Sequence, residues 1–247
     1  QLRVFYQPII DLGTGRSDRV EALVRWVHPT RGLVSPAEFI PISERTGLIE
    51  EIGAWVLDDV VRQCRVWQDA GSPMQVSLNV SARQLIDSSL PATFDAALRR
   101  HGVAPDSLVV EVTEQALATE GDVVLSTLGA LSELGVGIAL DDFGTGLGSI
   151  AALRDLTVDM VKIDKIFIDE LDRSGEGYAI VAAMVQLAAV VGSHVVAEGV
   201  ESESQLELLR ELGCDLAQGY LFSPAVFDLE TSTSDRTWTP QRLEHHG

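Results

Sequence analysis

The stretch Gly137-Ile138-Ala139-Leu140-Asp141-Asp142-Phe143-Gly144-Thr145-Gly146 is a short apolar run that ends in two adjacent aspartates and a glycine-rich turn. Successive side chains of a strand point to opposite faces, so Ile138 and Leu140 share one face while Ala139 and Asp141 share the other. Two neighbouring carboxylates repel each other and are costly to desolvate without cations. The stretch therefore indicates a strand with a divalent metal site at its C-terminal end. The alternative is a solvated turn, since Asp and Gly are ordinary turn formers.

Length, composition and charge restrict the class of protein. The 247 residues, of which 46% are hydrophobic, suffice for a single α/β barrel, which typically needs about 250 residues. The net charge of −19 argues against binding to DNA or RNA duplexes and to anionic membranes, which requires basic patches. Cys64 and Cys214 form no CxxC pair, which fits a reducing compartment. The most apolar segment, 179–191, is too short to insert into a membrane. We therefore expect a cytoplasmic protein, or the cytoplasmic part of a membrane-anchored one.

Strand and helix patterns alternate about eight times along the chain. Strands are expected at 3–10, 19–26, 75–80, 108–112, 137–141, 158–164, 194–198 and 214–218. Helices are expected at 52–69, 91–101, 122–134, 177–191 and 202–212, with shorter ones after Ser35 and Ser81 and near 149–154. Ser35, Ser81 and Ser202 each begin a capping pattern, and Pro36 suits the first helical position. Parallel strands joined by helical crossovers at this spacing favour a (β/α)8 TIM-type barrel.

A doubly wound open sheet is the alternative fold. Its dinucleotide-binding fingerprint, GxGxxG, would need a third glycine where Ser149 follows Gly144 and Gly146. The tripeptide Asp142-Phe143-Gly144 also matches a kinase motif, but the lysine strand and the catalytic loop that accompany it in kinases are absent from the sequence. We reject both the dinucleotide-binding and the kinase interpretations.

In a barrel, one parity of the strands brings a set of polar residues together at the mouth. These residues are Glu21, Asn79, Glu111, Asp141, Lys162, Glu198 and Gln218. Polar residues at the C-terminal ends of such strands are typical of catalytic sites. Oxygen ligands without Cys or His favour Mg²⁺ or Mn²⁺ over zinc. This many carboxylates can hold two ions roughly 3.5–4 Å apart, an arrangement used to cleave phosphate esters. Asp141 would then bridge the ions and Asp142 would bind the second one.

Lys162 has two interpretations, because an inward lysine is costly unless it is paired. It is either a structural counter-ion for the carboxylates, or the group that orients the attacking water and helps to deprotonate it. Arg25, in register with Glu21, either contacts a phosphate or forms a salt bridge. The pattern E-x-x-E follows two strands, as Glu111/Glu114 and Glu198/Glu201. The second glutamate of each pair is either a loop anchor or a ligand.

Eight short motifs follow one another through nearly the whole chain. They are Tyr6-Gln7-Pro8-Ile9, Glu21-Ala22-Leu23 followed by Arg25, Asn79-Val80-Ser81, Glu111-Val112-Thr113-Glu114, Asp141-Asp142-Phe143-Gly144-Thr145-Gly146, Lys162-Ile163-Asp164, Glu198-Gly199-Val200-Glu201 and Gln218-Gly219-Tyr220. In this order they resemble the motifs of the EAL-type cyclic-di-GMP phosphodiesterases. The chain departs from that pattern at Leu147 and Gly148, where the family usually has an aromatic or polar residue and then serine. It also departs at Ser223–Val226, where Arg-Pro is frequent.

The resemblance implies a barrel whose first strand runs antiparallel to the others. It implies hydrolysis of cyclic di-GMP to linear pGpG with two Mg²⁺ or Mn²⁺ ions per active site. The implied metal ligands are Glu21, Asn79, Glu111, Asp141, Asp142 and Glu198. Lys162 would bind the nucleophilic water, Glu198 is a further candidate for the general base, and Gln218 would lie close to the water and the metals. The implied substrate contacts are Gln7, Leu23 and Arg25, and Glu114 would anchor the loop after Asp142.

The domain prediction assigns residues 1–230 to the EAL-type barrel and 231–247 to a flexible tail that includes a cloning remnant. We expect this barrel to be a fragment of a longer protein with fused sensory or cyclase domains, and we expect a homodimer as one of its assemblies. Two other functions stay open. One is a catalytically weak or silent receptor for cyclic di-GMP, which loss of the ligands would favour, and the other is a barrel that acts on a different phosphodiester.

Overall fold

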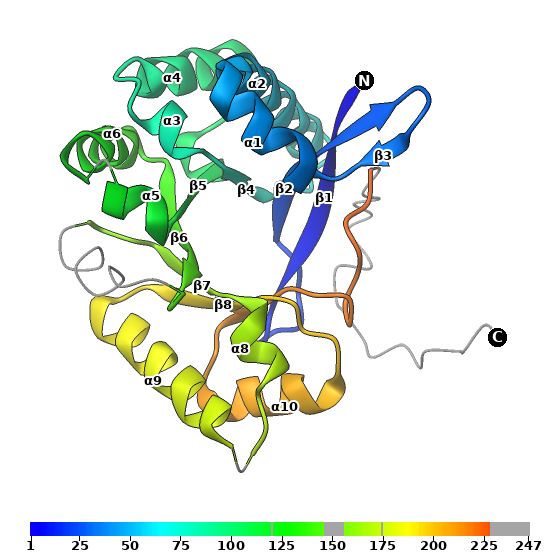
Figure 1. The fold of residues 1–247 in the computed structure, drawn as a ribbon, viewed down its shortest axis with the longest axis vertical. Coiled ribbons are helices and arrows are strands. Elements are labelled where there is room, and N and C mark those ends of the chain that lie inside the picture. The colour runs from blue at the N-terminus through cyan, green and yellow to red at the C-terminus, as the bar shows by residue number, and fades with distance from the viewer. Residues whose placement is uncertain (120, 146–155, 174, 228–247) are drawn as a thin grey trace.

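Eight strands close into a barrel in the computed structural model, which describes residues 1–119, 121–145, 156–173 and 175–227 (Figure 1). The strands are β1 (Leu2–Asp11), β2 (Arg19–His28), β4 (Gln75–Asn79), β5 (Leu108–Thr113), β6 (Gly137–Phe143), β7 (Met160–Ile163), β8 (His194–Ala197) and β9 (Leu216–Ala217). From β2 and β4 through to β9, neighbouring strands pair in parallel. β1 pairs antiparallel with both β2 and β9 and so closes the ring. The predicted barrel with an antiparallel first strand is confirmed.

Helices cover the outside of the barrel (Figure 1). They are α1 (Pro36–Thr46), α2 (Leu48–Asp69), α3 (Ala82–Leu85), α4 (Leu90–His101), α5 (Glu114–Thr119), α6 (Gly121–Leu134), α8 (Lys165–Asp169), α9 (Glu176–Val191) and α10 (Glu203–Leu212), with a 3-10 turn at Pro105–Ser107. Of the helices in the described part of the chain, none combines the length and the hydropathy that crossing a bilayer requires.

The capping predictions had different outcomes. Ser81 and Ser202 each form a full capping box at the start of α3 and α10. The capping pattern at Ser35 was wrong: Pro36 does begin α1, but the Ser35 side chain makes no capping bond. Glu38, the expected partner, instead forms an ion pair with Arg31 in the hairpin that precedes the helix. The Glu38 carboxylate thus pairs with the guanidinium of Arg31 and not with the backbone N–H of Ser35.

Short elements were missed because three to six residues carry no readable periodicity. The strand β3 (Gly32–Val34) extends β2 as a hairpin, while α5 and α8 follow β5 and β7 directly. The helix expected near 149–154 lies outside the described residues, as do Leu147, Gly148 and the tail 231–247. The division of the chain at residue 230 stays a prediction.

The inside of the barrel is built in two layers. An apolar layer consists of Ile9, Val109, Ala139, Met160, Val196 and Leu216, which form a buried cluster of their own. On the parallel strands, each of these residues lies two positions before a polar residue of the mouth, as Met160 does before Lys162. The opposite parity packs into the main core beneath the helices. The polar mouth therefore lies on a buried apolar layer, and the low dielectric constant of this layer strengthens the electrostatic interactions in the mouth.

Met160 offers a test of this layer, because its side chain is 4% exposed directly below Lys162. We expect Met160→Ala to lower the free energy of unfolding by about 2–5 kcal/mol through lost burial and a new cavity. Urea unfolding followed by circular dichroism measures the loss. Val190→Ala on α9 is the control, since Val190 is 83% exposed and should change stability by less than about 0.5 kcal/mol. Equal effects of the two substitutions would contradict the layered interior.

Candidate active site

Lys162 Nζ lies at the centre of the barrel mouth. It is 2.6 Å from Glu198 Oε1, 2.7 Å from Glu111 Oε2, 3.3 Å from Glu21 Oε2 and 3.6 Å from Asp141 Oδ1. These carboxylates come from β2, β5, β6 and the residue after β8, so four parts of the barrel converge on one ammonium group. The sequence-predicted cluster is thus brought together by the fold.

Three amide side chains extend the cluster around Glu21. Asn79 Nδ2 donates to Glu21 Oε1 at 2.9 Å, and Gln218 Nε2 donates to Glu21 Oε2 at 2.8 Å. Gln218 Nε2 also donates to Gln7 Oε1 at 3.0 Å, and Gln7 Nε2 donates to the carbonyl of Ser223 at 3.0 Å. Gln7 reaches the mouth because the antiparallel pairing of β1 with β2 places it opposite Glu21.

Asp142 leaves the strand geometry at the point where the second carboxylate is needed. Its φ of 54° lies in the left-handed region, and it is the only residue other than glycine in the described part of the chain with a positive φ. Its N–H donates to Asp141 Oδ1 at 3.0 Å, and Thr145 donates to its carbonyl through both N–H and hydroxyl. Neighbouring residues of a strand would face opposite sides. The left-handed turn lets Asp142 interact with Asp141, Asp164 and Lys162 together.

The mouth holds more negative than positive charge. Burial raises the pKa of Glu198 to about 7, although Lys162 opposes the shift. Burial and Asp141 raise the pKa of Asp142 to about 6. Burial and the neighbouring carboxylates also raise the pKa of Glu111 well above its ordinary range. Burial alone would lower the pKa of Lys162, but the surrounding carboxylates outweigh it and raise that pKa, so the lysine stays charged.

These residues fit a divalent cation that prefers oxygen ligands. The donors are carboxylates and amides, and the buried Oε1 of Gln218 has no hydrogen-bond partner among the described residues. Within that same part of the chain, no three acidic, His or Cys side chains already form a metal cage. Lys162 Nζ lies among the carboxylates, within 3.6 Å of four of them. Cations would therefore share the carboxylates with the lysine and reduce the excess negative charge.

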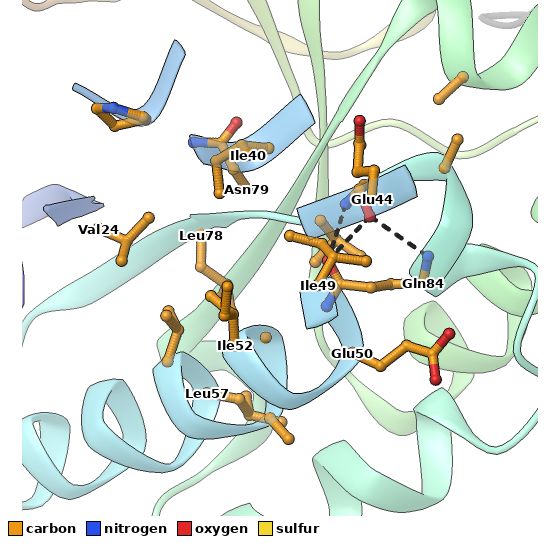
Figure 2. Close-up of a pocket in the computed structure, with 18 of the residues that line it drawn as sticks. Val24, Ile40, Glu44, Ile49, Glu50, Ile52, Leu57, Leu78, Asn79 and Gln84 are labelled. Atoms are coloured by element: carbon orange, nitrogen blue, oxygen red, sulfur yellow. Dashed lines mark hydrogen bonds between the residues drawn. The ribbon is translucent and has the colours of Figure 1, made fainter. Parts of the chain in front are cut away.

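The predicted substrate contacts Leu23 and Arg25 lie beside the cluster and not in it. With Asn79 they help to line a pocket of about 810 Å³ between β2, β4 and the helices α1 to α5 (Figure 2). The walls are largely apolar, and Figure 2 shows Ile40 of α1 and Ile52 of α2 among them. Sequence reasoning missed this pocket. Its one signal was the apolar composition of α1, a helix too short to be assigned to a site.

The two E-x-x-E patterns differ in their second glutamate. Glu114 is buried at the first position of α5, 2% exposed, but most of the loop it was expected to anchor lies outside the described residues, so its role stays a prediction. Glu201 is no part of the central cluster, because its Oε1 accepts from Lys165 Nζ at 2.8 Å. The segment Ser223–Val226, which departs from the family pattern, is attached to the barrel, since Val226 forms an antiparallel backbone bridge with Tyr6.

Known proteins are similar to this chain in sequence and in fold. A family model described as EAL domain matches residues 1–225. The chain is 44% identical over 222 residues, 90% of its length, to the bifunctional diguanylate cyclase/cyclic di-GMP phosphodiesterase MucR of Pseudomonas aeruginosa, of which it covers 32%. It is 40% identical over 218 residues, 88% of its length, to cyclic di-GMP phosphodiesterase PA2567 of the same organism, of which it covers 37%. The solved complex of the PaMucR phosphodiesterase with c-di-GMP matches with a TM-score of 0.87 and 43% identity, over 92% of each chain. The chain thus spans about a third of the length of the curated relatives it matches.

Removal of the central ammonium should destabilise the fold. Lys162→Met would leave four carboxylates, of which Glu21 and Glu111 are buried, without their counter-ion, and loss of one partner of a buried ion pair typically costs about 3–5 kcal/mol. We expect a loss of this size in urea unfolding at pH 7.5 with EDTA, and a smaller loss with Mg²⁺ present or at pH 5.5, which is below the pKa of about 7 of Glu198. Arg99→Met, which breaks an exposed ion pair with Asp95, is the control and should change little. If the loss of unfolding free energy depended on neither pH nor Mg²⁺, packing and not charge would explain the effect.

Cation affinity should depend on pH. Protons compete with cations for Glu198 and Asp142, whose pKa values of about 7 and about 6 exceed those of ordinary carboxyls. Below pH 7 Glu198 is mostly protonated. We therefore expect Mn²⁺ affinity to fall by about tenfold per pH unit as pH decreases from 7 to 6, and we expect protons to be released on binding. Isothermal titration calorimetry in buffers of different ionisation enthalpy measures both quantities. Equal affinity at pH 6 and pH 8 would contradict this assignment.

Proposed function

The chain belongs to the EAL domain family, and from this premise we propose that it is a phosphodiesterase that hydrolyses cyclic di-GMP to linear pGpG with two Mg²⁺ or Mn²⁺ ions in the barrel mouth. Relatives named as cyclic di-GMP phosphodiesterases and the solved c-di-GMP complex support the substrate. The observation that carries the proposal is the placement of Lys162 Nζ within 3.6 Å of four carboxylates from four parts of the barrel.

The carboxylates and Asn79 hold the cations in this proposal. The ligands are Glu21, Asn79, Glu111, Asp141, Asp142 and Glu198. When bound, such cations lower the pKa of a coordinated water and stabilise the negative charge that develops on the phosphate. An excess of negative charge around a single ammonium is the feature of this mouth that favours cation binding.

The remaining residues act on the water and on the substrate. Lys162 donates a hydrogen bond to the attacking water and orients it. Glu198, 2.6 Å from that ammonium and with a pKa raised to about 7, accepts a proton of the water as the water oxygen bonds to phosphorus and the P–O3′ bond breaks, because a base with a pKa near the working pH is efficient. The leaving O3′ then takes up a proton and becomes a hydroxyl. Gln218, whose Oε1 is buried without a partner among the described residues, accepts a hydrogen bond from the water.

Substrate recognition falls to the rim and the neighbouring pocket. Gln7 lies next to Gln218, where it contacts the dinucleotide. Leu23 and Arg25 help to line the apolar pocket. The half-buried guanidinium of Arg25 is the cation of this group, and it contacts a phosphate of the substrate. Cytoplasmic location, fused sensory or cyclase domains and a homodimer belong to the same proposal, and the 32% coverage of MucR fits a longer protein.

The direct test is to incubate the purified chain with cyclic di-GMP and Mg²⁺ or Mn²⁺ and to separate the products by liquid chromatography. We expect pGpG to appear, and we expect excess EDTA to stop its formation. Binding of cyclic di-GMP, measured by calorimetry with Ca²⁺ and with no divalent cation, is followed in parallel. Binding without pGpG would favour the silent receptor, and neither binding nor turnover would favour a different phosphodiester.

Asp142→Asn is the matched variant for this assay. Asparagine tolerates the left-handed backbone as aspartate does, so the substitution removes charge and leaves the turn. We expect turnover to fall by at least about 10³-fold while the melting temperature stays within about 3 °C, since one ion of a pair is lost and the fold is not. Asp95→Asn, on the exposed face of α4, serves as the charge-matched control. Near-normal turnover in Asp142→Asn would overturn the two-ion arrangement.

A further inference from the structure

The turn after β8 presents Glu198 to the mouth and is held firmly on one side. Gly199 has a φ of 67°, in the region that favours glycine. Val200 is fully buried, its N–H donates to the carbonyl of Gln218 at 3.0 Å, and its carbonyl accepts from Leu221 N–H at 3.0 Å. These bonds tie the turn to the segment that follows β9.

The other side of the turn is covered by Lys165, the first residue of α8. A Cβ atom on Gly199 would lie 2.4 Å from Lys165 Cγ and 2.7 Å from its Cβ and Cδ, so the lysine stem lies directly against this backbone. The ammonium of Lys165 donates to Glu201 Oε1 at 2.8 Å and to Asp169 Oδ1 at 2.7 Å. One side chain therefore contacts both the backbone next to Glu198 and the carboxylate three residues later.

The helix α8 is fixed in turn to the end of β7. Asp164 Oδ1 accepts from Ile166 N–H at 2.7 Å and caps the helix. Inside the barrel, Lys162 already joins the end of β7 to Glu198 at 2.6 Å. Lys165 connects the same two strand ends outside the barrel. The Glu198 turn is therefore contacted by Lys162 on the inside and by Lys165 on the outside.

We propose that Lys165 is a positioning residue that clamps the turn from Glu198 to Glu201 against α8 and so sets the place of the Glu198 carboxylate beside Lys162. The part of this proposal that concerns turnover rests on the proposed function, and the part that concerns the turn itself does not.

A positioning role and a stabilising role predict different results. Lys165 and Glu201 have side chains that are 44% and 48% exposed, and exposed ion pairs contribute little to folding stability. A catalytic group displaced by about 1 Å can nevertheless lower the rate by about 10²-fold. Loss of Lys165 should thus affect the turn and the reaction much more than the melting temperature.

The test compares Lys165→Ala, which removes stem and charge, with Lys165→Met, which keeps most of the stem, and with Lys165→Arg, which keeps the charge. Arg173→Ala is the control, because Arg173 forms an exposed ion pair with Glu211 at 2.7 Å, at the far end of α10. The primary measurement is amide hydrogen exchange of the peptide that spans residues 198–202, made without cation or substrate. Mn²⁺ affinity and the kcat and KM for cyclic di-GMP follow.

We expect exchange of this peptide to accelerate by about tenfold in Lys165→Ala and less in Lys165→Met. In Lys165→Ala the kcat should fall by about 10–10²-fold with KM within about threefold, and Mn²⁺ affinity should weaken severalfold. Lys165→Arg should restore most of each effect, and Arg173→Ala should match the wild type. Unchanged exchange in Lys165→Ala, or a melting temperature more than about 5 °C below that of Arg173→Ala, would overturn the inference. Faster exchange in a chain that produces no pGpG would leave the clamp standing and reject the proposed function.

Discussion

Charge balance in the barrel mouth is the constraint on which the rest of this structure depends. Lys162 contacts four carboxylates at 2.6–3.6 Å, and such a group is tolerable in a protein interior only when the geometry is good and the remaining polar atoms are bonded. The amides of Asn79 and Gln218 meet the second requirement by donating to the two oxygens of Glu21. The apolar layer beneath excludes water from below and so strengthens both attraction and repulsion. A cluster with one ammonium remains short of positive charge, and this shortage makes the mouth receptive to cations.

The antiparallel first strand matters for the same site. A parallel β1 would present a different register, whereas the antiparallel pairing sets Gln7 opposite Glu21 and leads the chain away from the mouth. β1 also receives the segment near Val226, which pairs with Tyr6. The carbonyl of Ser223, just before that bridge, accepts from Gln7. Through β1, Gln7 therefore lies opposite Glu21 of β2 and also contacts Gln218 and Ser223, which follow β9.

The sequence predicted those parts of the fold that repeat and missed those that depend on single contacts. Strand alternation placed Glu111, Asp141 and Lys162 on one face, because the parity of a strand is read directly from spacing. Parity could not place Asp142, whose position depends on a left-handed backbone that no spacing encodes. The partners of Glu38 and Glu201 were also beyond the sequence, since an arginine of a hairpin and a lysine of a five-residue helix reach these carboxylates only after folding. The apolar pocket was missed for the same reason, because residues of β2, β4 and the helices α1 to α5 form its walls only after folding.

Asp142 lies at a position where the stability of the fold and the negative charge of the mouth favour different residues. A residue other than glycine in this region carries strain of about 1–3 kcal/mol, and the raised pKa of Asp142 adds an electrostatic penalty at neutral pH. Glycine would relieve both, and asparagine would relieve the second. Glu21 differs, because burial would raise its pKa but Lys162, Gln218 and Asn79 outweigh the effect of burial and lower that pKa. Under the proposed function, cation binding offsets the cost at Asp142, because the Asp142 carboxylate is one of those that hold the ions.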